Sequence, residues 1–221
     1  MTTFSGNAIS RPPALIRDQV AAQIRDAIAD LRLLPGQVLV ERELCESTTA
    51  SRATVREALR QLQSEGLVTS TNGKGTVVAT LSVEQAQQIY EVRSALEGLA
   101  GRLFAERATA ADRRALRSAL LAVEEAAPNT REMLLAKSTF YAALMKGANN
   151  AELETSLAGL NRRATLVRAV SLTAPGRVSA SLAELAALCE AAVNGEGALA
   201  EELARKHIEN AAKAGIPLLQ T

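Results

Sequence analysis

The segment from Ser51 to Arg60 (SRATVREALR) constrains the fold of this chain more than any other stretch. At about 100° per residue, Arg52, Arg56 and Arg60 fall along one stripe of a helix. The adjacent stripe is apolar and able to bury itself, and it consists of Val55, Ala58, Leu59 and Leu62. Ser51 occupies the position of an N-cap. A helix with one buried face and one arginine-lined face has the shape that enters a DNA major groove, although a solvated arginine face is the commoner outcome.

The sequence before this helix predicts further short elements. An amphipathic helix is expected from Ala14 to about Asp30, and Leu34-Pro35-Gly36 ends it. A short strand at residues 38–40 and a short helix at residues 41–47 are expected next.

Two β-prone runs follow the arginine-striped helix, which ends near Ser64. Residues 67–71 and 76–79 flank Asn72-Gly73-Lys74-Gly75, which is a strong hairpin signal. The order of elements is that of a winged helix-turn-helix, with Lys74 at the wing tip between two glycines. A generic surface hairpin is the alternative interpretation of the wing.

After Thr80 the strand signals stop and the chain is expected to be mainly α. The predicted helices cover residues 82–107, 109–127, 130–147, 151–172, 178–193 and 196–215. They predict an all-α antiparallel bundle of about six helices. We therefore expect a flexible tail at 1–13, a winged helix-turn-helix at 14–80 and a helical domain at 81–221.

Composition narrows the classes of partner. The formal net charge is +1, so a nucleic-acid footprint must be local rather than global. Aromatic residues make up 2% of the chain, which argues against base-stacking platforms for single strands. No apolar run approaches the ~18 residues of a membrane helix, and the N-terminus lacks the pattern of a signal peptide. We expect a cytoplasmic protein without a membrane partner. Cys45 and Cys189 are expected to be small buried thiols.

Several motifs resemble the GntR-type transcription regulators. They are Pro35-Gly36, Glu41-Arg42-Glu43-Leu44, residues 51–59 (SRATVREAL) and Glu65-Gly66-Leu67-Val68. Residues 90–97 (YEVRSALE) resemble the start of the effector domain in the FadR-like subgroup with an FCD-type domain. The resemblance covers roughly residues 15–215.

The resemblance implies a homodimer that binds an inverted-repeat DNA operator. It implies that Arg42 contacts a phosphate, that Ser51, Arg52, Thr54 and Arg56 contact bases or backbone, and that Gly73, Lys74 and Gly75 reach the minor groove. An arginine can bond a guanine bidentately. Ala53 departs from the family, where a threonine is common at this position, and removes a hydroxyl.

The effector domain departs further from its family. Many FCD-type domains hold a divalent metal through an aspartate, a histidine four residues later and two histidines on later helices. The matching positions here are Lys137, Tyr141, Leu185 and His207, so one ligand of the set remains. Lysine and leucine cannot hold Zn²⁺ or Ni²⁺, and no metal cofactor is expected. A site combining Cys189 with His207 is a remote alternative.

Lys137 in place of the metal suggests a carboxylate effector, and Arg93 matches a family arginine that often faces the effector. The alternative is a Lys137 that extends to solvent and an Arg93 paired with Glu97 one turn away. An acyl-type ligand is a further possibility.

Three functions compete. The first is a ligand-responsive transcription factor, expected to be a repressor, although no residue distinguishes repression from activation. The second is a constitutive DNA-binding dimer whose sensor has lost its ligand. The third, an enzyme, is opposed by the absence of a phosphate loop, a paired-cysteine motif or a nucleophile elbow.

Overall fold

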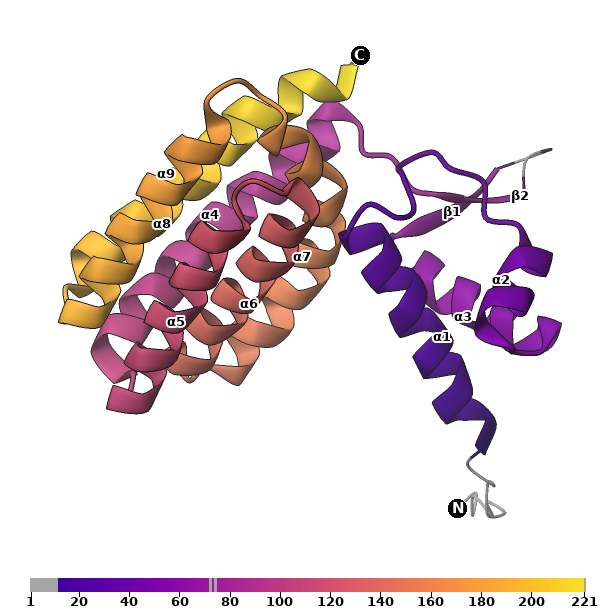
Figure 1. Cartoon of the computed structure of the whole chain (residues 1–221), viewed down its shortest axis with the longest axis horizontal. Helices are drawn as coiled ribbons and strands as arrows, with labels where there is room; N and C mark the ends of the chain where they lie inside the picture. The colour runs from indigo at the N-terminus through magenta and orange to yellow at the C-terminus, as the bar shows by residue number, and fades with distance from the viewer. Residues whose placement is uncertain (1–11, 72, 74, 221) are drawn as a thin grey trace, which may run out of the picture.

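The computed structural model describes residues 12–71, 73 and 75–220, which form two lobes joined near Thr80 (Figure 1). The smaller lobe contains α1 (Pro12–Ala29), α2 (Glu41–Thr48), α3 (Arg52–Ser64), β1 (Val68–Thr71) and β2 (Gly75–Val78). The larger lobe contains α4 (Val83–Arg107), α5 (Ala110–Ala126), α6 (Thr130–Ala148), α7 (Ala151–Leu172), α8 (Arg177–Asn194), α9 (Gly197–Gly215) and the 3₁₀ turn η1 (Ile216–Gln220). This is the expected winged helix-turn-helix followed by a helical bundle.

The arginine-striped helix α3 forms as its pattern predicts. The Ser51 side chain accepts a hydrogen bond from the Thr54 amide at 3.2 Å and so caps the helix. Its apolar stripe, Val55, Ala58, Leu59 and Leu62, is buried against α1 and the hairpin. β1 and β2 pair antiparallel, with Thr71 opposite Gly75. The apolar stripe therefore fixes which face of α3 is presented to solvent.

Two predictions for the small lobe are wrong, namely the start of α1 and the strand at residues 38–40. α1 begins at Pro12 rather than Ala14, because the first-turn amides of a helix have no intrahelical acceptor and proline is tolerated there. Residues 38–40 form no full strand, since Val38 makes a single bridge to Val77 and only the backbone of residues 36–39 bonds along β2. Residues 1–11 of the predicted tail lie outside the described residues, and so does Lys74 at the predicted wing tip.

The larger lobe is organised around α4, which packs against α6, α7, α8 and α9. Reciprocal capping boxes start its first two helices: Ser82 with Gln85 before α4, and Thr109 with Asp112 before α5. No helix of the described residues is long and apolar enough to cross a membrane.

An apolar cluster continues from one lobe into the other. Ile28 of α1 and Leu67 belong to the same buried cluster as Ile89 of α4, Val167 of α7 and Ile208 of α9. Two ion pairs cross the same junction, Arg131–Asp30 at 2.9 Å and Arg162–Glu65 at 3.5 Å. The lobes are therefore packed together rather than tethered by a bare linker.

Two helical glycines of the larger lobe provide a test of how α6 packs on α4. An added Cβ at Gly147 would clash with the ring of the buried Phe104, whereas at Gly159 its nearest neighbour is the end of Arg162 at 3.9 Å. Gly159→Ala should raise the free energy of unfolding by up to about 1 kcal/mol through helix propensity. Gly147→Ala should lower it by about 1–3 kcal/mol through overpacking. Urea unfolding measures both, and equal stabilisation by the two substitutions would contradict the packing of α6 on α4.

Candidate functional site

The exposed face of α3 carries the residues expected to read DNA. Arg52, Arg56 and Arg60 are exposed, while the Ser51 and Thr54 hydroxyls lie 2.9 Å apart at the start of the helix. Guanidinium groups on the solvent side of a helix can bond phosphates or base edges. The geometry permits the predicted contacts.

Helix α2 supplies acidic partners for Arg56 of α3 and for its own Arg42. The Nε atom of Arg56 donates to both carboxylate oxygens of Glu41, at 3.0 and 2.9 Å. Arg42 lies 3.8 Å from Glu46. Exposed pairs of this kind contribute about 0–1 kcal/mol, so a phosphate can replace the carboxylate. Arg42 and Arg56 are therefore available to a polyanion.

The wing presents Gly73 and Gly75 with φ of +80° and +77°. An added Cβ at either position would meet nothing within 4 Å, so glycine is favoured here by backbone conformation and not by crowding. Lys74 between them lies outside the described residues.

A second group of polar residues lies inside the larger lobe. Arg93 of α4, Lys137 and Tyr141 of α6 and His207 of α9 are buried around a cavity of ≈20 Å³. Leu185, the fifth residue predicted to face the effector, is fully buried in the apolar core and does not line this cavity. The structure thus brings together four of the five predicted positions.

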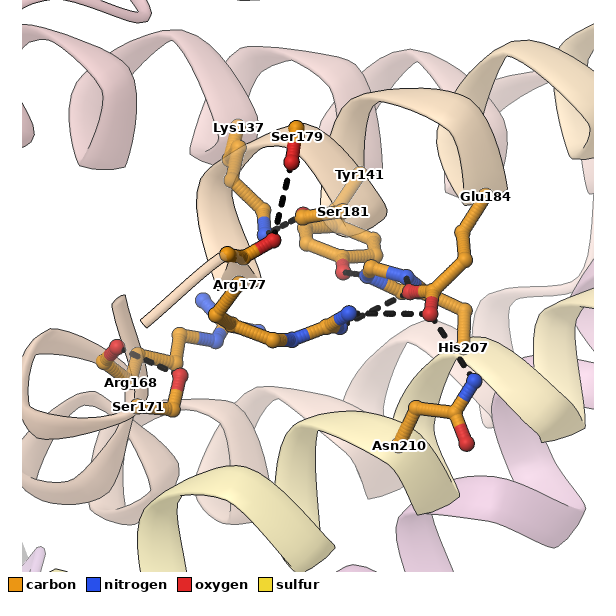
Figure 2. Close-up of polar contacts among 11 residues, drawn as sticks. Lys137, Tyr141, Arg168, Ser171, Arg177, Ser179, Ser181, Glu184, His207 and Asn210 are labelled. Carbon is orange, nitrogen blue, oxygen red and sulfur yellow. Dashed lines mark hydrogen bonds and ion pairs between the residues drawn. The ribbon is translucent and has the colours of Figure 1, made fainter. Parts of the chain in front are cut away.

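A chain of hydrogen bonds connects α6, α8 and α9 (Figure 2). His207 lies 2.8 Å from the Tyr141 hydroxyl through Nε2 and 2.5 Å from Glu184 through Nδ1. Arg177 donates both Nη atoms to Glu184 at 2.8 Å, and Asn210 donates to the same carboxylate. Lys137 donates to the Ser181 hydroxyl at 2.8 Å. The polar groups of three helices are therefore held in one arrangement.

The protonation states follow from burial and these bonds. Burial lowers the pKa of His207 to about 4, against the opposing hydrogen bond to Glu184, so the ring is neutral at pH 7. We assign its proton to Nδ1, which donates to Glu184, and Nε2 then accepts from Tyr141. Burial raises the pKa of the Glu184 carboxyl, but hydrogen bonds from His207, Arg177 and Asn210 outweigh this effect and hold it at about 2. Burial also raises the pKa of the Tyr141 phenol.

Arg93 is both paired with Glu97 and placed at the cavity, which the sequence analysis had given as alternatives. It pairs with Glu97 at 2.5 Å, one helical turn away, and both side chains are almost fully buried. It also lines the cavity, and its Nη1 atom has no hydrogen-bond partner. The pKa of Arg93 is raised because the Glu97 charge outweighs burial. Arg93 is therefore charged, with one donor unused.

Lys137 and Arg168 make the cavity cationic. Lys137 does not extend to solvent; burial lowers its pKa to about 7, and the charges of Arg168 and Arg177 add to the effect. Arg168 bonds to the Asn161 side chain at 3.0 Å and stacks over the Tyr141 ring. Among the described residues neither cation has a carboxylate partner, and an unpaired charge is costly where it is buried, as it is at Lys137. The arrangement favours an anion.

The donor set does not fit a divalent metal. The Lys137 ammonium and the Tyr141 phenol act as donors, Leu185 is apolar, and both ring nitrogens of His207 are engaged. Within the described ranges no three His, Cys, Asp or Glu side chains are grouped to hold one. Cys189 is buried in apolar surroundings, which raise the pKa of its thiol to about 11.

Sequence reasoning missed several members of this cluster. Glu184, Arg177 and Ser181 lie on α8 at positions where polar side chains are ordinary on a helix surface, and Asn161 and Arg168 lie likewise on α7. A signal was present in α8, since Arg177, Ser181 and Glu184 recur at the spacing of one helix face.

The chain is similar to known bacterial regulatory proteins. Residues 88–210 match the description "FCD domain", and residues 16–78 match "Bacterial regulatory proteins, gntR family". The chain is 33% identical over 135 residues to the Nta operon transcriptional regulator of Aminobacter aminovorans. It is 35% identical over 145 residues to the probable D-xylose utilization operon transcriptional repressor of Paenarthrobacter nicotinovorans. The matches cover 61% and 63% of this chain, and the chain spans 64% of the length of each relative.

Solved structures share the fold. Escherichia coli McbR/YncC superimposes with a TM-score of 0.76 at 21% identity, covering 96% of this chain and 98% of that one. A GntR regulator from Rhodococcus sp. RHA1 gives 0.76 at 23% identity, covering 93% and 98%.

The buried lysine gives this site a distinctive pH dependence. The folded pKa of Lys137 is about 7 and the ordinary value is 10.5, so the unfolded chain binds more protons between these values. Wild-type stability therefore gains from this residue as the pH rises above 7. Lys137→Met removes the gain, so its stability relative to wild type should fall by up to about 2–3 kcal/mol between pH 7 and pH 9. Urea unfolding at both pH values measures the difference. The exposed Lys146 on the same helix is the control, and an equal pH dependence for Lys146→Met would contradict a buried ammonium.

Proposed function

The chain belongs to the GntR family of bacterial regulatory proteins and carries an FCD domain, and from this premise we propose a sequence-specific DNA-binding repressor controlled by a small carboxylate. Residues 14–80 read the DNA, and residues 81–221 bind the effector and dimerise. The protein is not an enzyme and acts in the cytoplasm. The repressor role rests on the printed name of the relative from Paenarthrobacter nicotinovorans.

The exposed arginine face of α3 supports the DNA part of the proposal. Ser51 and Thr54 start the helix, Arg52 and Arg56 point away from its buried stripe, and the glycine-rich wing lies beside it. Two such units in a homodimer would contact an inverted repeat, since two-fold symmetry in the protein is matched by the operator.

The observation that carries the effector part is a pair of cations without a carboxylate partner, the buried Lys137 and the half-buried Arg168. A carboxylate bound beside them would accept the unused Nη1 donor of Arg93 and restore charge balance. Binding to one arrangement of the bundle would then shift the dimer between DNA-competent and DNA-incompetent geometries.

A constitutive DNA-binding dimer is the second candidate. Two observations favour it: the cavity of ≈20 Å³ has room for about one water, and His207 already satisfies both ring nitrogens inside the protein. Such a protein would bind DNA and ignore small acids.

Selection of bound sequences from a random DNA pool tests the DNA part. Arg52→Ala and Arg56→Ala should each weaken binding of the selected sequence by about 5- to 150-fold, the value of a bidentate arginine–base contact. Arg117→Ala, an exposed arginine on α5, is the matched control and should change affinity little. Fluorescence anisotropy at one fixed salt concentration gives the affinities. The DNA proposal fails if no sequence is enriched or if all three variants bind alike.

Thermal unfolding with monocarboxylates, dicarboxylates and sugar acids tests the effector part. An acid at 100 times its Kd should add about 2.7 kcal/mol of stability, whereas Zn²⁺, Ni²⁺ and chelator should add none. Because the bound anion favours protonated Lys137, affinity should fall by up to about tenfold per pH unit above 7, and this dependence should disappear in Lys137→Met. Stabilisation by zinc would overturn the metal-free site, and indifference to every acid would favour the constitutive dimer.

A further inference from the structure

A larger hollow lies where the two lobes meet, and neither lobe forms it alone. The junction groove, with a volume of ≈290 Å³, is lined by α1 and Leu67 on one side and by α6 and α7 on the other. Its apolar lining includes Ile28, Leu67, Met145, Leu157 and Ala158. This volume is at the lower end of the ~300–1,000 Å³ typical of ligand sites, so a small molecule would fill it.

Ion pairs lie beside the groove, one within the small lobe and two across the junction. Arg25 of α1 donates both Nε and Nη2 to Glu65 at 2.9 and 2.8 Å, and Arg162 of α7 lies 3.5 Å from the same carboxylate. Burial raises the pKa of Glu65, but the bonds from Arg25 outweigh burial and lower it, so the carboxylate stays charged. Arg131 at the start of α6 bonds to Asp30, beyond the end of α1. The lining is thereby fixed by salt bridges and not by direct packing alone.

The inner end of the groove reaches the cationic cavity. Tyr141 and Arg168 line both hollows, and Asn161, which accepts a hydrogen bond from Arg168, lines the groove. The Arg168 guanidinium lies 5.0 Å from the centre of the Tyr141 ring, so these two side chains form the partition. Movement of one arginine would join the 290 Å³ groove to the 20 Å³ cavity.

We propose that the junction groove binds the alkyl chain of an amphipathic monocarboxylate whose carboxylate lies at Arg168, facing Lys137 and Arg93. The inference rests on the proposed function, because it takes the buried cations as the anion site, and it adds where the rest of the ligand lies. The cavity has room for about one water, so the alkyl chain lies in the apolar groove, and the carboxylate faces Lys137 and Arg93 once Arg168 has moved aside. The occupant is therefore a linear or aromatic acid of about six to eight carbons, by the groove's size.

Charges on the groove disfavour a second carboxylate on the ligand. Asp26 and Glu154 also line the groove and are exposed, whereas the lining arginines Arg25 and Arg162 are already paired with Glu65. An anionic group at the outer end would meet these two acids without a free cation. Dicarboxylates of the same length should bind more weakly than monocarboxylates.

A ligand in this groove would contact the winged helix-turn-helix directly. α1 forms one side of the groove and packs on α3, whose arginine face is the proposed DNA contact. An occupant between α1 and α6–α7 would favour one placement of the small lobe over another. Effector and DNA would then be coupled through the position of α1.

Isothermal titration calorimetry on the full chain tests the proposal with butyrate, hexanoate and octanoate. Each added methylene should tighten binding about fourfold, from ~0.8 kcal/mol per buried CH₂. Hexanol, which lacks the anion, should not bind measurably, and adipate should bind at least about tenfold more weakly than hexanoate because it meets Asp26 and Glu154.

Two substitutions fill the groove without touching the inner cavity. Ala158→Phe on α7 and Ala142→Phe on α6 should reduce octanoate affinity to that of butyrate and leave butyrate binding within about twofold, since Ala142 and Ala158 line the groove and not the cavity. Ala142 is exposed, so its variant should fold even if the other does not. Ala115→Phe, exposed on α5, is the control and should retain the full chain-length dependence.

The possible outcomes separate this inference from the proposed function. The groove proposal is wrong if the affinity of the acids does not depend on chain length. It is also wrong if both groove variants keep that dependence. In either case the proposed carboxylate site is not contradicted. Failure of every acid to bind the wild type overturns both ligand proposals, and the DNA selection remains an independent result. Loss of chain-length dependence in the groove variants alone supports the groove.

Discussion

Buried positive charge without matching negative charge is the constraint on which the bundle depends. Arg93 and Arg177 are neutralised by Glu97 and Glu184, whereas Lys137 and Arg168 are held by a hydroxyl, an amide and an aromatic ring. Without an anion, the protein reduces the cost by letting the ammonium lose its proton near pH 7. The surrounding hydrogen bonds link α4, α6, α7, α8 and α9, so the charge state of the cavity bears on how these helices pack.

The periodicity of apolar residues in the sequence predicted most of the fold. The buried stripe of α3, the Ser51 cap and the hairpin are local features, and each was predicted from residues close in sequence. Where the prediction failed, longer-range geometry decided. Residues 36–39 bond along β2 because of where the hairpin lies, and propensity at residues 38–40 could not show that this pairing ends after one bridge.

The interior site was predictable only in part. Lys137, Tyr141, Arg93 and His207 were identified by alignment with a family pattern, and the fold brings all four together. Leu185 matched the same pattern yet belongs to the apolar core. Glu184, one residue earlier, supplies the carboxylate that orients His207, and Arg177 and Asn210 hold that carboxylate. These contacts join different helices, so sequence spacing alone could not reveal them.

The proposed anion site of the bundle is made by Lys137, Arg93 and Arg168, and the titration of Lys137 tests it most directly. The chain has five lysines, so the Nζ resonance of Lys137 can be assigned by NMR with one Lys137→Arg variant. The account predicts a pKa near 7 for Lys137, rising when a carboxylate binds. An ordinary pKa near 10.5 for Lys137, unchanged by any acid, would contradict it.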